Sequence, residues 1–191
     1  MNELEKRILS DGIALNDHVL KVDSFVNHQV DVKLMEDIGK DFAAHYKDAN
    51  ITKVVTIETS GIAPAVFTAL YLNVPLIILK KRASKTLTED IFQTTITSFT
   101  KNISYDLTLS KKYLNDNDNV IIIDDFLANG EAAMGAVTLT KQAGANIEGI
   151  GILIEKSFQS GRERLIKAGY DVYSLARISS LSEGKITFIE E

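Results

Sequence analysis

The segment from Val120 to Ala133 constrains this chain more than any other. The four residues from Val120 to Ile123 are all β-branched, which suits a strand buried on both faces in the middle of a parallel sheet. Asp124 and Asp125 follow, at the carboxyl end of that strand, where open α/β sheets bind their ligands. The segment therefore predicts an open α/β sheet with a parallel centre and a ligand site at its carboxyl edge.

The residues after the acid pair indicate what that ligand is. Asp124 and Asp125 can accept hydrogen bonds from vicinal hydroxyls, each contributing about 1.5 to 3 kcal/mol. Ala128-Asn129-Gly130 has little side-chain bulk, and a helix is predicted from Glu131 to Gln142, with its N-terminal amides free to bind an anion. The pattern favours a ribose-phosphate site over the plain alternative, a strand-to-helix turn in which the acids serve as caps.

Size and charge narrow the class of protein. A chain of 191 residues with 45% hydrophobic content can bury one full core, so we expect a single domain over 1–191. The net charge is −5 and no long basic cluster occurs, which argues against nucleic-acid binding. Cysteine is absent, which excludes disulfides and thiol chemistry. A charged N-terminus and the lack of a long apolar run predict a cytoplasmic protein without a membrane segment.

Hydrophobic periodicity predicts the elements around the site. Before the central segment, helices are expected over 3–10, 31–46 (capped by Asp31) and 62–71, strands over 53–57 and 76–79, an exposed loop over 81–93, and a hairpin of 94–99 with 103–109. After the central helix, strands are expected over 147–154 and near Val172 and Ile186, with a helix over 162–167. Residues up to about 50, with the chain end, would form a small hood on a core of about 51–178.

A second anion site is expected where the strand 53–57 ends. Ser60 and Gly61 form a small turn before a helix, which is either a second cradle of amides or a simple capped turn. Lys81 and Arg82 follow the next strand and could neutralise a leaving anion, although a solvated basic loop is the plain alternative. The three histidines show no metal-ligand spacing and receive no role.

Four separated blocks extend the pattern along the whole chain. The blocks are 19–29 (VLKVDSFVNHQ), 58–65 (ETSGIAPA), 98–101 (SFTK) and 155–159 (EKSFQ). Together with the central segment, they resemble the type I phosphoribosyltransferase family, and within it the bacterial branch that acts on xanthine. One departure is the lack of the phosphate-loop hydroxyls that many members have, so backbone amides must bind more of the phosphate.

The resemblance implies a reaction and a set of residues. Phosphoribosyl diphosphate (PRPP) and xanthine would be the substrates, Mg²⁺ would be held mainly through PRPP, and the enzyme would be a homodimer with residues 98–101 in a flexible flap. An unusual peptide is implied near 59–61. By this resemblance Asp124 and Asp125 are catalytic; Ala128, Asn129, Gly130, Glu131, Ala132, Ser60, Gly61, Lys81 and Arg82 bind PRPP; and Leu20, Asn27 and Lys156 bind the purine.

Alternatives stay open at this point. Taken singly, each residue has a plain alternative: a strand cap for Lys156, a turn for Asn27 and a core position for Leu20. Phe158 has two readings, a stack on the base and a packed aromatic, and the second is favoured. An ammonium at Lys156 donates but cannot accept, so it favours an oxopurine over adenine and separates xanthine from guanine or hypoxanthine less surely. A PRPP-sensing transcriptional regulator would keep the acid pair, but it would need an added DNA-binding module.

Overall fold

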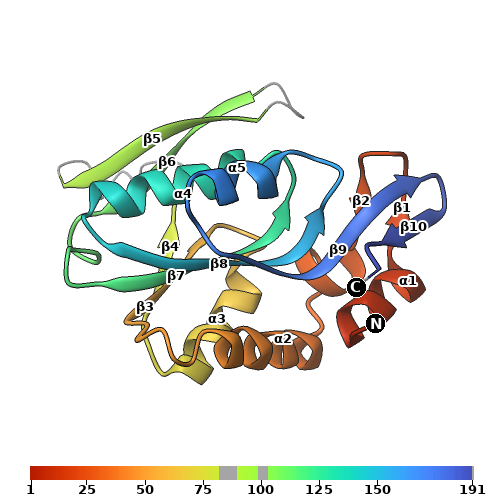
Figure 1. The fold of residues 1–191 in the computed structure, drawn as a ribbon, viewed down its shortest axis with the longest axis horizontal. Coiled ribbons are helices and arrows are strands. Elements are labelled where there is room, and N and C mark those ends of the chain that lie inside the picture. The colour runs from red at the N-terminus through yellow and green to blue at the C-terminus, as the bar shows by residue number, and fades with distance from the viewer. Residues whose placement is uncertain (82–89, 99–102, 191) are drawn as a thin grey trace.

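The main sheet places the predicted site at its centre. The computed structural model describes residues 1–81, 90–98 and 103–190. The strand order is β10-β9-β8-β7-β3-β4, and every neighbouring pair is parallel except β9 with β10, which confirms the open α/β sheet (Figure 1). The strands are β3 (Lys53–Ile57), β4 (Leu76–Leu79), β7 (Asn119–Leu127), β8 (Asn146–Lys156), β9 (Val172–Ser182) and β10 (Lys185–Phe188).

Strand β7 lies between β3 and β8, and its residues from Val120 to Ile123 are fully buried, as predicted. One expectation about it was wrong. Asp124 and Asp125 do not follow the strand but lie within it, because β8 continues alongside and Leu127 still pairs with Glu155. The acids are therefore held by a paired backbone, which positions them more rigidly than a loop would.

Helices cover both faces of the sheet. Helices α4 (Glu131–Gln142) and α5 (Gly161–Lys167) lie on one face, and α2 (Val32–His45) and α3 (Ile62–Leu72) on the other (Figure 1). Alternate side chains of β7 serve the two sides: Ile121 and Ile123 join one hydrophobic cluster, while Val120 and Ile122 join the other. This alternation follows from the two-residue period of a strand. Asp31 caps α2, as expected, by accepting a hydrogen bond from the Leu34 amide at 3.1 Å.

The two chain ends meet at one end of the sheet. The amide of Gly184, beside β10, donates to the Ala14 carbonyl at 3.0 Å, and the Asn2 side chain donates to the Leu175 carbonyl at 2.6 Å. Segment 13–30 contains a short strand pair and one π-helix. We call this N-terminal part the hood: α1 (Glu3–Asp11), β1 (Ile13–Ala14), β2 (Leu20–Lys21) and the π-helix η1 (Asp23–Asn27).

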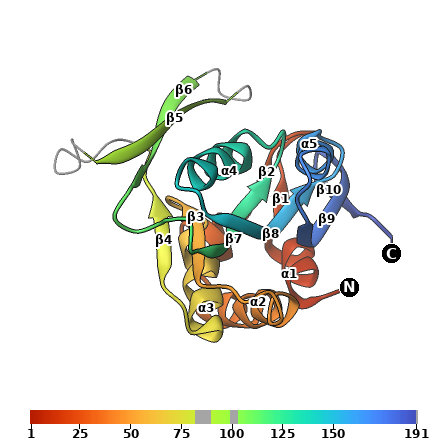
Figure 2. The ribbon, with the colours of Figure 1, turned by 60° about the vertical axis from the view of Figure 1, so that its left-hand side comes forward.

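A hairpin of β5 (Ile91–Ser98) and β6 (Ile103–Ser110) stands off the main sheet beside α4 (Figure 2). Lys80 and Thr108 join it to the end of β4 through two backbone hydrogen bonds of 3.0 and 2.8 Å. The loop expected over 81–93 extends too far, because β5 already begins at Ile91. Phe92 pairs with Leu109 and packs on the core. Arg82 and flap residues 99–101 lie outside the described residues.

Within residues 1–81, 90–98 and 103–190, no helix is both long enough and apolar enough to cross a membrane.

Candidate active site

Two predicted site segments meet at the centre of the sheet. Asp124 is only 6% exposed, and its carboxylate accepts a hydrogen bond from the Asp125 amide at 3.0 Å. Gly61, at the start of α3, lies directly against it: a Cβ added there would stand 3.1 Å from Asp124 Oδ1 and 2.4 Å from Thr56 Oγ1. Only glycine fits this contact. The acid pair and the Ser60-Gly61 turn therefore share one site, as the order of the strands requires.

The acid pair is electrostatically unfavourable when it is fully ionised. Burial raises the pKa of Asp124 well above its usual range, and the neighbouring charge of Asp125 raises it further. Burial also raises the pKa of Asp125. Negative charge in such a site is stabilised when a positive charge arrives beside it. The pair is thus suited to a ligand that carries or develops positive charge.

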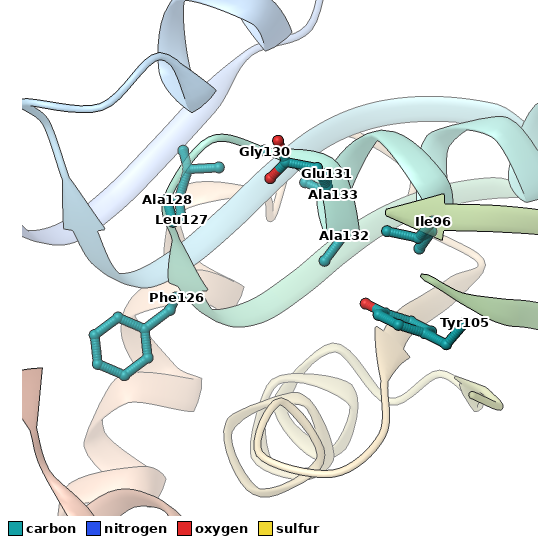
Figure 3. Close-up of a pocket in the computed structure, with 9 residues that line it drawn as sticks. All are labelled: Ile96, Tyr105, Phe126, Leu127, Ala128, Gly130, Glu131, Ala132 and Ala133. Carbon is teal, nitrogen blue, oxygen red and sulfur yellow. The ribbon is translucent and has the colours of Figure 1, made fainter. Parts of the chain in front are cut away.

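The loop after β7 borders a small cavity. Gly130 adopts a positive φ of 86° at the start of α4, and it lies so close to Gly161 that a Cβ would be 3.1 Å from Gly161 Cα. The first amides of α4 have no partner within the helix. A cavity of about 150 Å³ lies in front of them. Its lining residues are Ile96, Tyr105, Phe126, Leu127, Ala128, Gly130, Glu131, Ala132 and Ala133 (Figure 3).

Residues of the hairpin contribute to this cavity, which sequence reasoning missed. Ile96 and Tyr105 are cross-strand partners and point from the hairpin toward the first turn of α4 (Figure 3). Burial raises the pKa of Tyr105, and the charges of Asp124 and Glu131 raise it further. The alternation of apolar residues in the hairpin was the available signal, because it places Tyr105 on the same face as Leu107.

Glu58 holds the first residues after β4. Its carboxylate accepts a hydrogen bond from the Lys81 amide at 2.7 Å and pairs with Lys80 Nζ at 3.1 Å. Burial alone would raise the pKa of Glu58, but these bonds outweigh it and the pKa is lowered. Lys81 Nζ lies 5.7 Å from the Tyr105 ring centroid. The Glu58-Thr59 peptide bond is cis, next to the segment where an unusual peptide was expected.

The predicted base-binding residues come from the hood and from β8. Leu20 is 7% exposed and packs in the hood core, while Asn27 is exposed at the end of η1. Lys156 is the last residue of β8, and its Nζ donates to the His18 carbonyl at 2.6 Å. It also lies 5.5 Å from the Phe126 ring centroid, and burial lowers its pKa. Lys156 therefore connects the core to the hood.

Glu155 forms a buried network that the sequence did not reveal. It is 1% exposed, at the end of β8. Burial alone would raise its pKa, but hydrogen bonds from two hydroxyls and a guanidinium outweigh it and lower the pKa. The network joins the end of β8 to the first half of β9 and to α5. Its donors are Ser157, Ser174, Arg162 at 2.7 Å and Arg177 at 3.4 Å.

Within the described part of the chain, no three His, Asp or Glu side chains gather as a metal site. His18 is exposed, and His45 stacks on Tyr173 with ring centroids 3.8 Å apart. The acid pair offers oxygen ligands of the kind that Mg²⁺ prefers, but two adjacent carboxylates do not complete an octahedral shell. The arrangement suits a cation that brings most of its ligands with its substrate.

Comparison with known sequences identifies relatives over the full chain. The phosphoribosyl transferase domain family matches residues 27–175. A protein of Clostridium botulinum named xanthine phosphoribosyltransferase 1 is 60% identical, with all of both chains covered. The xanthine phosphoribosyltransferase of Clostridium acetobutylicum is 59% identical over 99% of this chain and 100% of its own. That of Acinetobacter baumannii is 52% identical, again with both chains fully covered.

Solved structures share the fold at lower identity. Adenine phosphoribosyltransferase from Trypanosoma brucei, solved with AMP, pyrophosphate and ribose-5-phosphate, superimposes with a TM-score of 0.74 at 19% identity, covering 91% of this chain and 79% of that one. The Giardia lamblia adenine enzyme, solved with 9-deazaadenine, gives a TM-score of 0.66 at 29% identity, covering 74% of this chain and 78% of its own.

Proposed function

The chain belongs to the phosphoribosyltransferase family, and we propose that it transfers the 5-phosphoribosyl group of PRPP to xanthine, which yields xanthosine 5′-monophosphate and diphosphate. The observation that carries the choice of base is identity of 52% to 60%, over the full chain, to proteins named for this reaction. The site is consistent with this chemistry, because the Ser60-Gly61 turn contacts Asp124 and the turn that begins α4 follows the same strand. This places the protein in purine salvage.

PRPP would lie across the end of the sheet. Its 5′-phosphate would bind the amides of residues 128–132, at the start of α4. Its diphosphate would bind the Ser60-Gly61 turn and the nearby Lys81, with Arg82 completing the cationic side. The ribose would then lie over Asp124 and Asp125, which are held within β7. Contact between Gly61 and Asp124 supports this order, since it puts the cradle of the leaving group beside the acids.

The reaction is a displacement at the anomeric carbon. A purine nitrogen forms the new bond to that carbon, the bond to the diphosphate oxygen breaks with its electron pair leaving on diphosphate, and the purine gives up a proton. Positive charge develops on the sugar at the transition state. Because both acids are costly to ionise alone, that charge is stabilised more strongly than the neutral ground state.

Lys156 would donate to an exocyclic oxygen of the base. Its position between Phe126 and the His18 carbonyl supports this role, since the ammonium already occupies the junction where the hood meets the core. Leu20 would form an apolar wall, and Asn27 would offer both a donor and an acceptor to the ring edge.

Magnesium would reach the site with its substrate. The diphosphate oxygens and water would supply most of its ligands, and Asp124 or Asp125 could add an oxygen. When bound, the ion neutralises charge on the leaving diphosphate.

A homodimer is also part of the proposal. Helix α3 supports an interface, because its outward face is apolar: Val66 is 45% exposed, Leu70 64% and Tyr71 41%. Exposed apolar surface of this kind is typical of an interaction site. Sedimentation of the purified protein would test it, and Leu70→Glu should shift a dimer toward monomer. The cytoplasmic location stays a prediction, which cell fractionation would test.

Product analysis tests the function directly. The protein is incubated with Mg²⁺, PRPP and one of xanthine, guanine, hypoxanthine or adenine, and the nucleotide formed is identified by mass. We expect the highest kcat/KM with xanthine. Preference for guanine or hypoxanthine would keep the chemistry and overturn the base. PRPP binding without any product would favour the regulator.

A further inference from the structure

A carboxylate lines the pocket proposed for the 5′-phosphate. Glu131 is the first residue of α4 and borders the cavity in front of the loop; its side chain is 18% exposed. A negative side chain at this place opposes a phosphate by charge repulsion, and it can compete for the same helix amides. Something must therefore make Glu131 compatible with an anionic ligand.

Arg164, one helix away on α5, contacts both Glu131 and the loop. Its Nη1 lies 3.2 Å from Glu131 Oε1, and the same nitrogen donates to the backbone carbonyl of Asn129. Figure 3 draws Glu131 at the outer edge of the loop, close to Gly130. A single guanidinium thus binds the carboxylate that borders the cavity and the backbone carbonyl of the loop residue before Gly130.

We propose that Arg164 is a positioning residue for PRPP binding: it draws the Asn129 carbonyl and the Glu131 carboxylate toward α5, so that the loop presents amides to the 5′-phosphate. The proposal rests on the function proposed above. Arginine suits this role because its planar guanidinium presents several donors in a fixed geometry, and it stays charged at any physiological pH.

Neighbouring contacts support this assignment. The Gly161 amide donates to the Ala128 carbonyl at 3.0 Å, so α5 holds the first carbonyl of the loop through its backbone and the second through Arg164. Because a trans peptide points its N–H opposite to its C=O, these two carbonyl contacts direct the amides of Asn129 and Gly130 away from their α5 partners. Arg164 then neutralises the carboxylate of Glu131, which lines the cavity.

Four variants test this mechanism: Arg164→Met, Arg164→Lys, Glu131→Gln and the double variant Arg164→Met/Glu131→Gln. Loss of the guanidinium should raise KM for PRPP about tenfold, the effect of one charge-assisted hydrogen bond, and leave KM for xanthine unchanged. Glu131→Gln alone should lower KM for PRPP, because the carboxylate that repels the phosphate is gone while Arg164 still binds the Asn129 carbonyl. The double variant should regain part of the loss, because the unmasked charge is gone.

A merely structural role predicts a different result. It would lower the melting temperature and affect both substrates, and Glu131→Gln would not rescue it. Lys167→Met is the matched control, since Lys167 lies on the same helix and pairs with the exposed Glu163; its KM for PRPP should equal that of the wild type. A wild-type KM for PRPP in Arg164→Met, or no recovery in the double variant, overturns the proposal.

A substitute variant and a direct binding measurement keep the outcomes separate. If Arg164→Met fails to fold, Arg164→Lys replaces it, and an unchanged KM for PRPP in that variant overturns the proposal. Calorimetric titration with PRPP and Mg²⁺, in the absence of xanthine, measures the affinity for PRPP without turnover. A wild type that binds PRPP but makes no nucleotide would refute the proposed function, while the ratio of PRPP affinities between wild type and variants would still decide the role of Arg164.

Discussion

The backbone of Gly161 lies against the carbonyl of Ala128. The Gly161 amide donates to that oxygen at 3.0 Å, and a Cβ at Gly161 would stand only 2.4 Å from it. Because real Cβ atoms are not found so close to a backbone oxygen, any side chain at Gly161 must displace the loop. The start of α5 therefore determines where the loop of residues 128–130 lies.

Gly161→Ala should accordingly weaken PRPP binding. We expect KM for PRPP to rise about tenfold and stability to fall by about 1 to 3 kcal/mol through overpacking, as measured by steady-state kinetics and urea denaturation. Gly169→Ala is the control, because Gly169 has a positive φ of 90° but nothing within 4 Å of an added Cβ. Gly169→Ala should lower stability and leave KM for PRPP unchanged. Equal KM values for PRPP in the two variants would contradict this account.

The acid pair should be required for turnover. Asp124→Asn with Asp125→Asn removes the charge that stabilises the developing sugar cation, so kcat should fall by at least about a hundredfold. Circular dichroism should show an unchanged fold, since asparagine keeps the size of aspartate. Retention of wild-type turnover by the double variant would remove the acids from the mechanism.

Asp124→Asn alone should stabilise the protein at neutral and alkaline pH. Burial and the charge of Asp125 raise the pKa of Asp124, so the folded protein is favoured at low pH and loses stability as pH rises through that raised pKa. A gain of about 1 kcal/mol would raise Tm by roughly 2 to 4 °C. Thermal melts across pH 4 to about 9 should show the advantage of the variant growing with pH; a constant or shrinking advantage is the opposite result.

Lys156→Ala should act mainly on the base. Loss of one charged donor should raise KM for xanthine by about 10- to 100-fold while KM for PRPP stays nearly unchanged. Because Lys156 also holds the His18 carbonyl, hydrogen exchange in the hood should become faster. Lys47→Ala, at an exposed lysine in the turn after α2, serves as control. Unchanged xanthine kinetics in Lys156→Ala would show that the specificity assignment is wrong.

Glu155→Gln should destabilise the folded state by about 2 to 3 kcal/mol at pH 7, since a buried charge partner of two arginines is lost. The pKa of Glu155 is lowered by its hydrogen bonds, so its contribution is present above the unfolded value, about 4.5, and is lost as pH falls through the folded value. Urea denaturation at several pH values checks this. The two proteins should converge in acid, and a gap that widens there would contradict the role.

Much of the fold was determined by local sequence patterns. The bounds predicted for β3, β4 and α4 agree with the structure, because each depends on hydrophobic periodicity and on flanking turn residues. The predicted order of strand, small loop and helix likewise agrees with β7, residues 128–130 and α4, although the acid pair lies within the strand and not after it. These features involve residues within a few positions of one another, so local sequence patterns are sufficient to predict them.

Tertiary structure alone decided how the site is supported. The contact of Gly61 with Asp124 and that of Lys156 with the His18 carbonyl join residues far apart in the chain, and no periodicity encodes such pairs. The contacts of Arg164 with Asn129 and Glu131 likewise join residues far apart in the chain. A strand or helix pattern says which face of an element is buried, whereas the neighbours across that face are chosen by packing of the whole chain.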